Sequence, residues 1–259
     1  ESTASAASIT PSDTTVQCRH CQTEHRESVF RQELSVCPSC GWHASLTAQE
    51  WIDHLADAES FREIGKRLFS ADPLNFTVTE PYRERLREAE LRTGMHEAAI
   101  GGEAKLDGRP LVLISLEFDF LGGTMGSVVG EKVARAFQTA TRRKLPVVSI
   151  LASGGARIQE GMLALMQMAK TATAVAAHKA ARLPYISVLT NPSFGGTFAS
   201  FGSLGDVLIG EPGAQIGFVG ARVVEGTINE RISKDERRAE TVLRHGMIDM
   251  VVPRRALRN

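Results

Sequence analysis

Three segments of the chain share one pattern: an apolar strand-like run, a pair of adjacent glycines, and a helix-like run. The strand-like runs cover residues 111–117, 145–151 and 184–190, and the glycine pairs are Gly122–Gly123, Gly154–Gly155 and Gly195–Gly196. One such pair would be explained by a tight turn. Three predict an α/β core whose glycine turns lie together at the carboxyl ends of the strands, where such sheets bind ligands.

The middle glycine pair has the clearest chemical implication. Glycine has no Cβ, so a ligand can approach the backbone of Gly154 and Gly155 closely. We expect a long helix to follow directly, because apolar residues share one face: Ile158, Met162, Leu165, Ala169, Ala172 and Ala176. The first N–H groups of a helix lack an intrahelical partner and can hold a developing oxyanion. Arg157 and Glu160 are interpreted as a salt bridge of this helix.

All four cysteines lie in one short segment, as two C-x2-C pairs that 15 residues separate: Cys18, Cys21, Cys37 and Cys40. This spacing is typical of a four-thiolate zinc ribbon, in which a closed tetrahedral site leaves no position for catalysis. Two disulfides or redox-active pairs are the alternatives, and the absence of a secretory signal argues against them. We expect a structural zinc ion that stabilises a segment too small for its own core.

The charge balance bears on the possible partners. The chain has 30 Lys and Arg against 30 Asp and Glu, which gives no electrostatic case for nucleic acid or an anionic membrane. Residues 18–50 hold three arginines and four glutamates, so the ribbon itself lacks the basic surface of a nucleic-acid binder. No apolar run approaches the roughly 18 residues of a membrane span.

Composition divides the chain into four parts. We expect a flexible tail over residues 1–15, the zinc ribbon over 16–46, a helical connector over 47–97 and the core over 98–259. Thr47-Ala-Gln-Glu50 resembles a capping box at the start of an amphipathic helix. The core is expected to close with a strand over 215–219, a helix near 222–231 and a strand over 248–252.

The core lacks the common catalytic motifs. No G-x-S-x-G elbow is present, and Ser153 lacks the first glycine of that motif, which argues against a serine nucleophile. No P-loop or G-x-G-x-x-G turn occurs, and none of the seven histidines is near a glycine pair. Backbone donors without convergent acids or bases suit a reaction in which a thioester carbonyl becomes an enolate whose oxygen must be held.

Several blocks, in the same order, resemble the carboxyltransferase β subunit of multisubunit acetyl-CoA carboxylase, of the bacterial or plastid type. They are the four cysteines and residues 118–130, 153–161, 165–170, 184–192 and 217–225. The resemblance extends from about Cys18 to about Pro253. It implies a crotonase-type core of repeated ββα units with an N-terminal zinc ribbon. It also implies transfer of CO2 from carboxybiotin to acetyl-CoA, which gives malonyl-CoA for fatty-acid synthesis.

The resemblance further implies roles and partners. Gly154 and Gly155 would hold the acyl-CoA thioester oxygen, and Gly122 and Gly123 would line the acyl-CoA pocket. The third pair, Gly195 and Gly196, is expected in the same substrate site. A separate α subunit would complete an α2β2 heteromer, and a biotin carrier protein would deliver the carboxybiotin. The sequence has no biotinyl-lysine motif or ATP-binding loop, so we expect one half-reaction, in the cytoplasm or, in a plant, the plastid stroma.

The chain departs from the family pattern at residues 230–238, at residues 41–46, which are not basic, and after Asn259, where an extension is expected. These departures leave a paralogue open as an alternative, acting on another acyl-CoA or on a carrier-bound acyl group by decarboxylation or condensation. A zinc-ribbon binding protein on an inactive core is a second alternative, against which the three glycine pairs argue.

Overall fold

The computed structural model describes residues 14–219, 226 and 233–259. The chain divides into two compact units, Glu1–Ala44 and Ser45–Asn259, and each has its own buried hydrophobic residues. Most of the tail expected over residues 1–15 lies outside the described residues, and Thr15 already begins the first strand. The helix expected near 222–231 also lies outside them, apart from Gly226.

The first unit is a small two-stranded structure. Strands β1 (Thr15–Gln17) and β2 (Glu24–Arg26) are antiparallel, and helix α1 (Glu27–Gln32) follows them. One C-x2-C pair lies in the turn between β1 and β2, and the other lies between the bridged residues Val36 and His43. Among the described residues of this unit, the buried apolar ones are Cys18, Phe30, Val36 and Cys37, so hydrophobic burial alone gives it little stability.

The second unit is built on one mixed sheet of eight strands formed by the described residues, with the order β10-β8-β7-β6-β5-β4-β3 and β9 paired to β7. Their bounds are β3 Arg62–Glu63, β4 Ala99–Leu106, β5 Arg109–Leu116, β6 Val147–Ser153, β7 Tyr185–Phe194, β8 Val207–Gly210, β9 Ile216–Gly217 and β10 Met250–Val251. Strands β5, β6 and β7 are parallel neighbours, whereas β3, β4 and β5 are antiparallel. The α/β core expected from the three strand-like runs is therefore confirmed.

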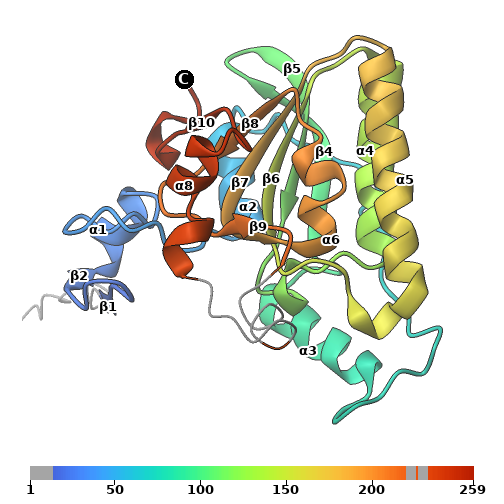
Figure 1. Ribbon diagram of the computed structural model, residues 1–259, viewed down its shortest axis with the longest axis horizontal. Coiled ribbons are helices and arrows are strands. Elements are labelled where there is room, and N and C mark those ends of the chain that lie inside the picture. Colours follow the sequence, from blue (N-terminus) through green and yellow to red (C-terminus); the bar gives the residue numbers. More distant parts are fainter. Residues whose placement is uncertain (1–13, 220–225, 227–232) are drawn as a thin grey trace, which may run out of the picture. The chain divides into compact units, whose positions relative to one another are not determined.

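Helices cover the sheet unequally (Figure 1). Helix α4 (Ser127–Arg143) connects β5 to β6, helix α5 (Gly161–Ala180) connects β6 to β7, and both lie on one face. Helix α2 (Ala48–Leu55) packs on the opposite face. Alternation along β5 supplies both layers, because Val112 and Ile114 pack in the α4 layer while Leu111 and Leu113 pack in the α2 layer.

The remaining helices are short, apart from α3 (Tyr82–Thr93), which contributes Tyr82, Leu86 and Ala89 to the core. Among the described residues, the short ones are α6 (Gly195–Phe198), α8 (Ala239–Arg244) and five 3-10 turns. The expected connector over 47–97 thus contains α2 and α3, and also β3, which pairs with β4 at the edge of the sheet. None of the described helices has the length and apolar character needed to cross a membrane.

The apolar residues expected on one face of α5 do lie on one side of the helix, but that side is exposed to solvent. Ile158 and Met162 are 72% and 70% exposed, and Leu165 is also exposed. The buried side instead holds Ala164, Gln167, Thr171, Ala174, Val175 and His178. Apolar residues occur on both sides of α5, and the other side packs closely against α4, where Gln167 lies against Gly130.

The capping box expected at Thr47 is confirmed. The Glu50 N–H donates to Thr47 Oγ1 at 3.2 Å, and the Thr47 N–H donates to Glu50 Oε2 at 2.8 Å. A second carboxylate, on Glu117 at the end of β5, accepts the Ala48 N–H at 2.8 Å. The first turn of α2 is therefore stabilised by its own capping box and by a hydrogen bond to the end of the sheet.

Replacing Thr47 with alanine should lower the free energy of unfolding by about 1 kcal/mol, because the Glu50 N–H loses its acceptor. Urea denaturation followed by circular dichroism measures this change. Thr47→Ser keeps the hydroxyl and serves as the matched control, with stability close to that of the unaltered chain. Equal losses in both variants would mean that the methyl group, and not the cap, matters.

Candidate active site

The structure brings the three glycine pairs together at one edge of the sheet. Each pair follows the carboxyl end of one of the parallel strands β5, β6 and β7. The Gly154 N–H donates to the Gly122 carbonyl at 2.8 Å. A Cβ built on Gly155 would lie 3.0 Å from the Gly195 Cα. The middle turn therefore contacts both of its neighbours through the backbone.

Positive φ angles and backbone crowding require glycine at several of these positions, among them Gly123, Gly155 and Gly195. Gly123 has φ +62°, and a Cβ there would lie 2.0 Å from the Ala152 carbonyl oxygen, closer than any real contact. Gly155 has φ +116° and packs against the backbone of Gly195. Side chains at these positions would push the ends of β5, β6 and β7 apart.

The backbone after Gly155 differs from the expectation. Helix α5 begins at Gly161 and not directly after the glycine pair, because Ala156 first pairs with Met125 in a parallel bridge. The N terminus of α5 therefore does not supply donors at the turn. The Gly155 N–H donates to Ser153 Oγ at 3.1 Å, and Gly196 lies at the start of α6, where an N–H has no intrahelical acceptor.

Ser153 is completely buried and acts as a hydrogen-bonding group of the turn. Its hydroxyl donates to Thr197 Oγ1 at 2.8 Å and accepts the Gly155 N–H. Within the described part of the chain, no histidine hydrogen-bonds to it, so the geometry gives it no base for nucleophilic attack. Sequence reasoning missed Thr197, although its position directly after a glycine pair was a usable signal.

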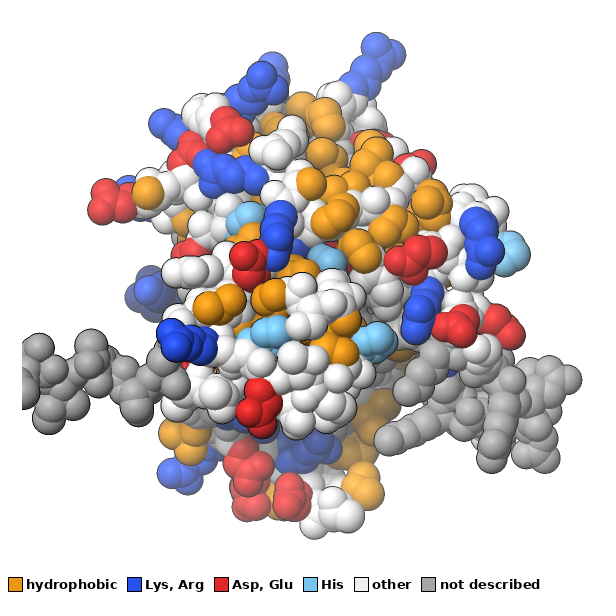
Figure 2. Space-filling view, turned by 90° about the vertical axis from the view of Figure 1, so that its left-hand side faces the viewer, with side chains coloured by type: hydrophobic (Ala, Val, Ile, Leu, Met, Phe, Trp, Pro, Cys, Tyr) orange, Lys and Arg blue, Asp and Glu red, His pale blue; other side chains and the backbone are white. Residues whose placement is uncertain are grey.

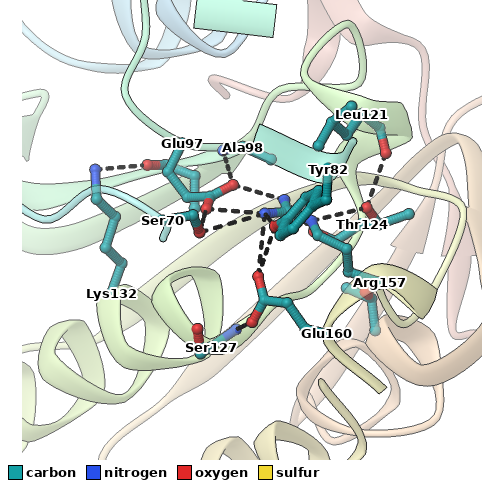
Figure 3. Close-up of polar contacts among 12 residues, drawn as sticks. Ser70, Tyr82, Glu97, Ala98, Leu121, Thr124, Ser127, Lys132, Arg157 and Glu160 are labelled. Atoms are coloured by element: carbon teal, nitrogen blue, oxygen red, sulfur yellow. Dashed lines mark hydrogen bonds and ion pairs between the residues drawn. The ribbon is translucent and has the colours of Figure 1, made fainter. Parts of the chain in front are cut away.

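A buried ionic cluster lies beside the glycine turns (Figure 3). Arg157 donates two hydrogen bonds to Glu97, from Nη2 to Oε1 at 2.6 Å and from Nη1 to Oε2 at 2.9 Å. The Tyr82 hydroxyl accepts from Arg157 Nη1 at 3.1 Å and donates to Glu160 Oε1 at 2.7 Å. All four side chains are inaccessible to solvent.

Arg157 also fixes the relative position of two turns. Its Nη2 donates to the Thr124 carbonyl at 2.8 Å, just after the Gly122–Gly123 pair. Its own N–H donates to the Met125 carbonyl at 3.0 Å, and the Met125 N–H donates to the Gly155 carbonyl at 2.8 Å. Backbone hydrogen bonds and the Arg157 guanidinium therefore hold the segment after Gly155 against the segment after Gly123.

The charges in this cluster are coupled. Burial lowers the pKa of Arg157, but the attraction of Glu97 and its hydrogen bonds outweigh burial, so the net pKa is raised. Burial also raises the pKa of Tyr82, which keeps its hydroxyl protonated. The expected salt bridge of Arg157 and Glu160 exists at 3.6 Å, but it is buried and lies before α5. The main partner of Arg157 is Glu97, which is 60 residues away in sequence and was not predicted.

Replacing Arg157 with methionine should lower the free energy of unfolding by roughly 3–5 kcal/mol, since Glu97 would be left buried without its partner. Urea denaturation of the full chain measures the change. The control is Arg135→Met, which breaks a 2.7 Å pair with Glu131 on the surface of α4 and should cost less than about 1 kcal/mol. Similar small losses in both variants would mean that Glu97 is not left as an unpaired buried charge.

The four cysteines also lie together. Their Sγ atoms are all within 4.8 Å of one another, with Cys18–Cys40 at 3.8 Å and Cys21–Cys37 at 3.7 Å. A tetrahedron with zinc–sulfur bonds of about 2.3 Å has edges of about 3.8 Å, whereas a disulfide bond is about 2.05 Å long. The arrangement fits a tetrahedral four-thiolate metal site. His25 Nε2 lies 3.4 Å from Cys37 Sγ, where a ring N–H would support the thiolate.

Comparison with known proteins defines the family. Residues 43–254 match the family described as the carboxyl transferase domain, so the chain belongs to that family. It is 46% identical over 242 residues to the acetyl-coenzyme A carboxylase carboxyl transferase subunit beta of Acaryochloris marina, covering 93% of this chain and 80% of that protein. This similarity supports carboxyl transfer to acetyl-CoA as the reaction and does not favour the paralogue.

Two further comparisons involve larger proteins. The chain is 45% identical over 248 residues to the acetyl-coenzyme A carboxylase carboxyl transferase subunits beta/alpha of Frankia alni, covering 96% of this chain but only 41% of that protein. It also resembles the crystal structure of transcarboxylase 12S with methylmalonyl-coenzyme A bound, with a TM-score of 0.68 and 25% identity over 88% of this chain and 41% of the other. The expected carboxyltransferase fold is thereby confirmed.

Proposed function

We propose that this chain is the β-type subunit of a carboxyltransferase that moves CO2 from carboxybiotin on a carrier protein to acetyl-CoA, giving malonyl-CoA. The observation that carries the proposal is the meeting of three glycine turns in a chain 46% identical to such a subunit. This edge offers backbone groups and little side-chain bulk. It suits a substrate whose thioester oxygen gains charge during reaction.

The thioester oxygen is held by backbone donors of the middle and third turns. We assign one donor to the Gly155 N–H. The substrate oxygen would replace Ser153 Oγ, which accepts this N–H at 3.1 Å, and Ser153 Oγ would keep its hydrogen bond to Thr197 Oγ1 at 2.8 Å. We assign the second donor to the Gly196 N–H, because it lies close to Gly155 and has no intrahelical acceptor at the start of α6. Gly154, whose N–H remains bonded to Gly122, contributes space for the acyl group. Gly122, Gly123 and Gly195 shape the same pocket through their backbone contacts.

The chain's own residues then act by positioning. Carboxybiotin, when bound, supplies the CO2 and the nitrogen that removes the acetyl α-proton. The donors at Gly155 and Gly196 stabilise the enolate oxygen that this proton removal creates. Arg157 and Glu97 hold the turn in place, so the donors do not need to reorganise during the reaction.

A partner chain completes the site. The exposed apolar side chains Ile158, Met162, Leu165 and Met166 begin directly beside the middle turn and follow α5. We assign this face to an α-type subunit, and the Frankia relative carries both subunit names on one chain. The stoichiometry is proposed as α2β2, with a separate biotin carrier protein. The location that follows is the cytoplasm or, for a plant chain, the plastid stroma.

The test is the carboxyl-transfer rate of the assembled complex with Gly154→Ala or Ser153→Ala. A Cβ on Gly154 meets no protein atom closer than 3.5 Å, so the fold accepts it, but the methyl group would displace the acyl group. We expect a loss of about a hundredfold, because a displacement of this size costs that much in rate. Ser153→Ala should lose much less, and the β-type chain without its partner should be inactive.

Thermal unfolding and partner binding of both variants are the controls, and both should change little. An unaltered rate in Gly154→Ala, combined with loss of all activity in Ser153→Ala, would reject the backbone site in favour of a serine mechanism. A fully active isolated chain would reject the need for a partner.

We also propose that Cys18, Cys21, Cys37 and Cys40 bind one structural zinc ion. Elemental analysis of the purified chain should give about one zinc per chain, and Cys37→Ser should reduce it strongly. Because the first unit buries so few apolar residues, removal of zinc should unfold this unit while the second unit stays folded. Metal-free protein that contains two disulfides would contradict this proposal.

A further inference from the structure

An apolar cavity of about 280 Å3 lies on the α2 face of the sheet, away from the glycine turns. Val148, Ile186 and Arg109, which line it, stand at the amino-terminal ends of β6, β7 and β5. The glycine turns follow the opposite, carboxyl-terminal ends of the same strands. The cavity is therefore a feature separate from the proposed carboxyl-transfer site.

The walls of the cavity are side chains that the short α2 helix leaves uncovered. Leu106, Val148, Ile186, Ile209 and Leu257 all line it and are only partly buried. Figure 2 views the molecule from this side and shows hydrophobic side chains gathered in the upper part of the view, with lysine and arginine side chains around them. An exposed apolar hollow of this kind marks a binding site more often than an ordinary surface.

The charge at the rim is positive and is not fully compensated. Arg109 and Arg258 line the cavity, and no Asp or Glu of the described residues does. Arg258 is neutralised, since it contacts Asp57 Oδ1 at 2.7 Å and Asp107 Oδ1 at 3.1 Å. Arg109 is exposed, and within the described residues no side-chain hydrogen bond or ion pair involves its guanidinium. Its position opposite Leu106 in the β4–β5 hairpin places its side chain on the cavity face.

We propose that this cavity binds a medium-chain fatty acid, with its alkyl chain on the sheet face and its carboxylate on Arg109. A guanidinium matches a carboxylate in shape and in charge, and the remaining wall offers only apolar contact. The volume of about 280 Å3 is at the small end for a ligand pocket, which favours a medium-length alkyl chain over a long one.

Isothermal titration calorimetry of the full chain at a pH where the acid is ionised tests the proposal, with hexanoate, octanoate, decanoate and dodecanoate below their micellar concentrations. The dissociation constant should fall about fourfold for each added methylene until the cavity is full, and then level off. Decanol and decyltrimethylammonium, which have the same chain length without the negative charge, should bind more weakly than decanoate.

Two variants locate the site. Arg109→Gln should weaken decanoate by about tenfold or more and leave decanol unchanged. Val148→Phe fills the cavity and should remove the binding of both ligands. The matched control is Arg142→Gln, an exposed arginine outside the cavity, which should change neither. Thermal unfolding should show that each variant is folded.

Three results would overturn the proposal. Decanoate that shows no saturable binding would do so, and so would binding that Val148→Phe leaves intact, because the ligand would then lie elsewhere. The third would be a dimer of the chain, seen by sedimentation velocity, that the Leu106→Arg substitution dissociates while decanoate shows no binding. That result would assign this face to a second copy of the chain.

Discussion

The buried ion pair between Arg157 and Glu97 is the interaction on which the geometry of the glycine turns depends. Its two hydrogen bonds of 2.6 and 2.9 Å connect the loop after β6 to the start of β4. Removing these charges from water is costly, and an apolar replacement of the same shape would often be as stable. The pair is better explained by position than by stability, because it holds the Gly155 segment against the Gly123 segment.

The sequence predicted the parts of the fold that local patterns encode. Local patterns predicted the position of the glycine pairs after the strands, the capping box at Thr47 and the grouping of the four cysteines, and the structure has each of them. The buried side of α5 could not be predicted, because small and apolar residues occur on both sides of the helix and only packing against α4 selects one side.

The position of the candidate site could be predicted from the sequence, but the hydrogen bonds and ion pairs that hold it together could not. That the glycine turns meet follows from parallel strands, whose carboxyl ends share one edge. The partner of Arg157 did not follow, because no local rule relates it to Glu97 in a segment interpreted as a connector. The backbone donors at the middle turn also differ from the expected ones, because the bridge between Ala156 and Met125 places the start of α5 at Gly161 and not directly after Gly155.

The close approach of Gly123 to Ala152 has a consequence for the energetics of ligand binding. With no room for even one methyl group between these turns, the ends of β5 and β6 cannot move independently. A ligand that binds beside these turns therefore loses its own conformational freedom but does not have to order the protein. Discrimination between ligands by induced closure must come from segments outside the turns, such as a partner chain, and the turns themselves select only by shape.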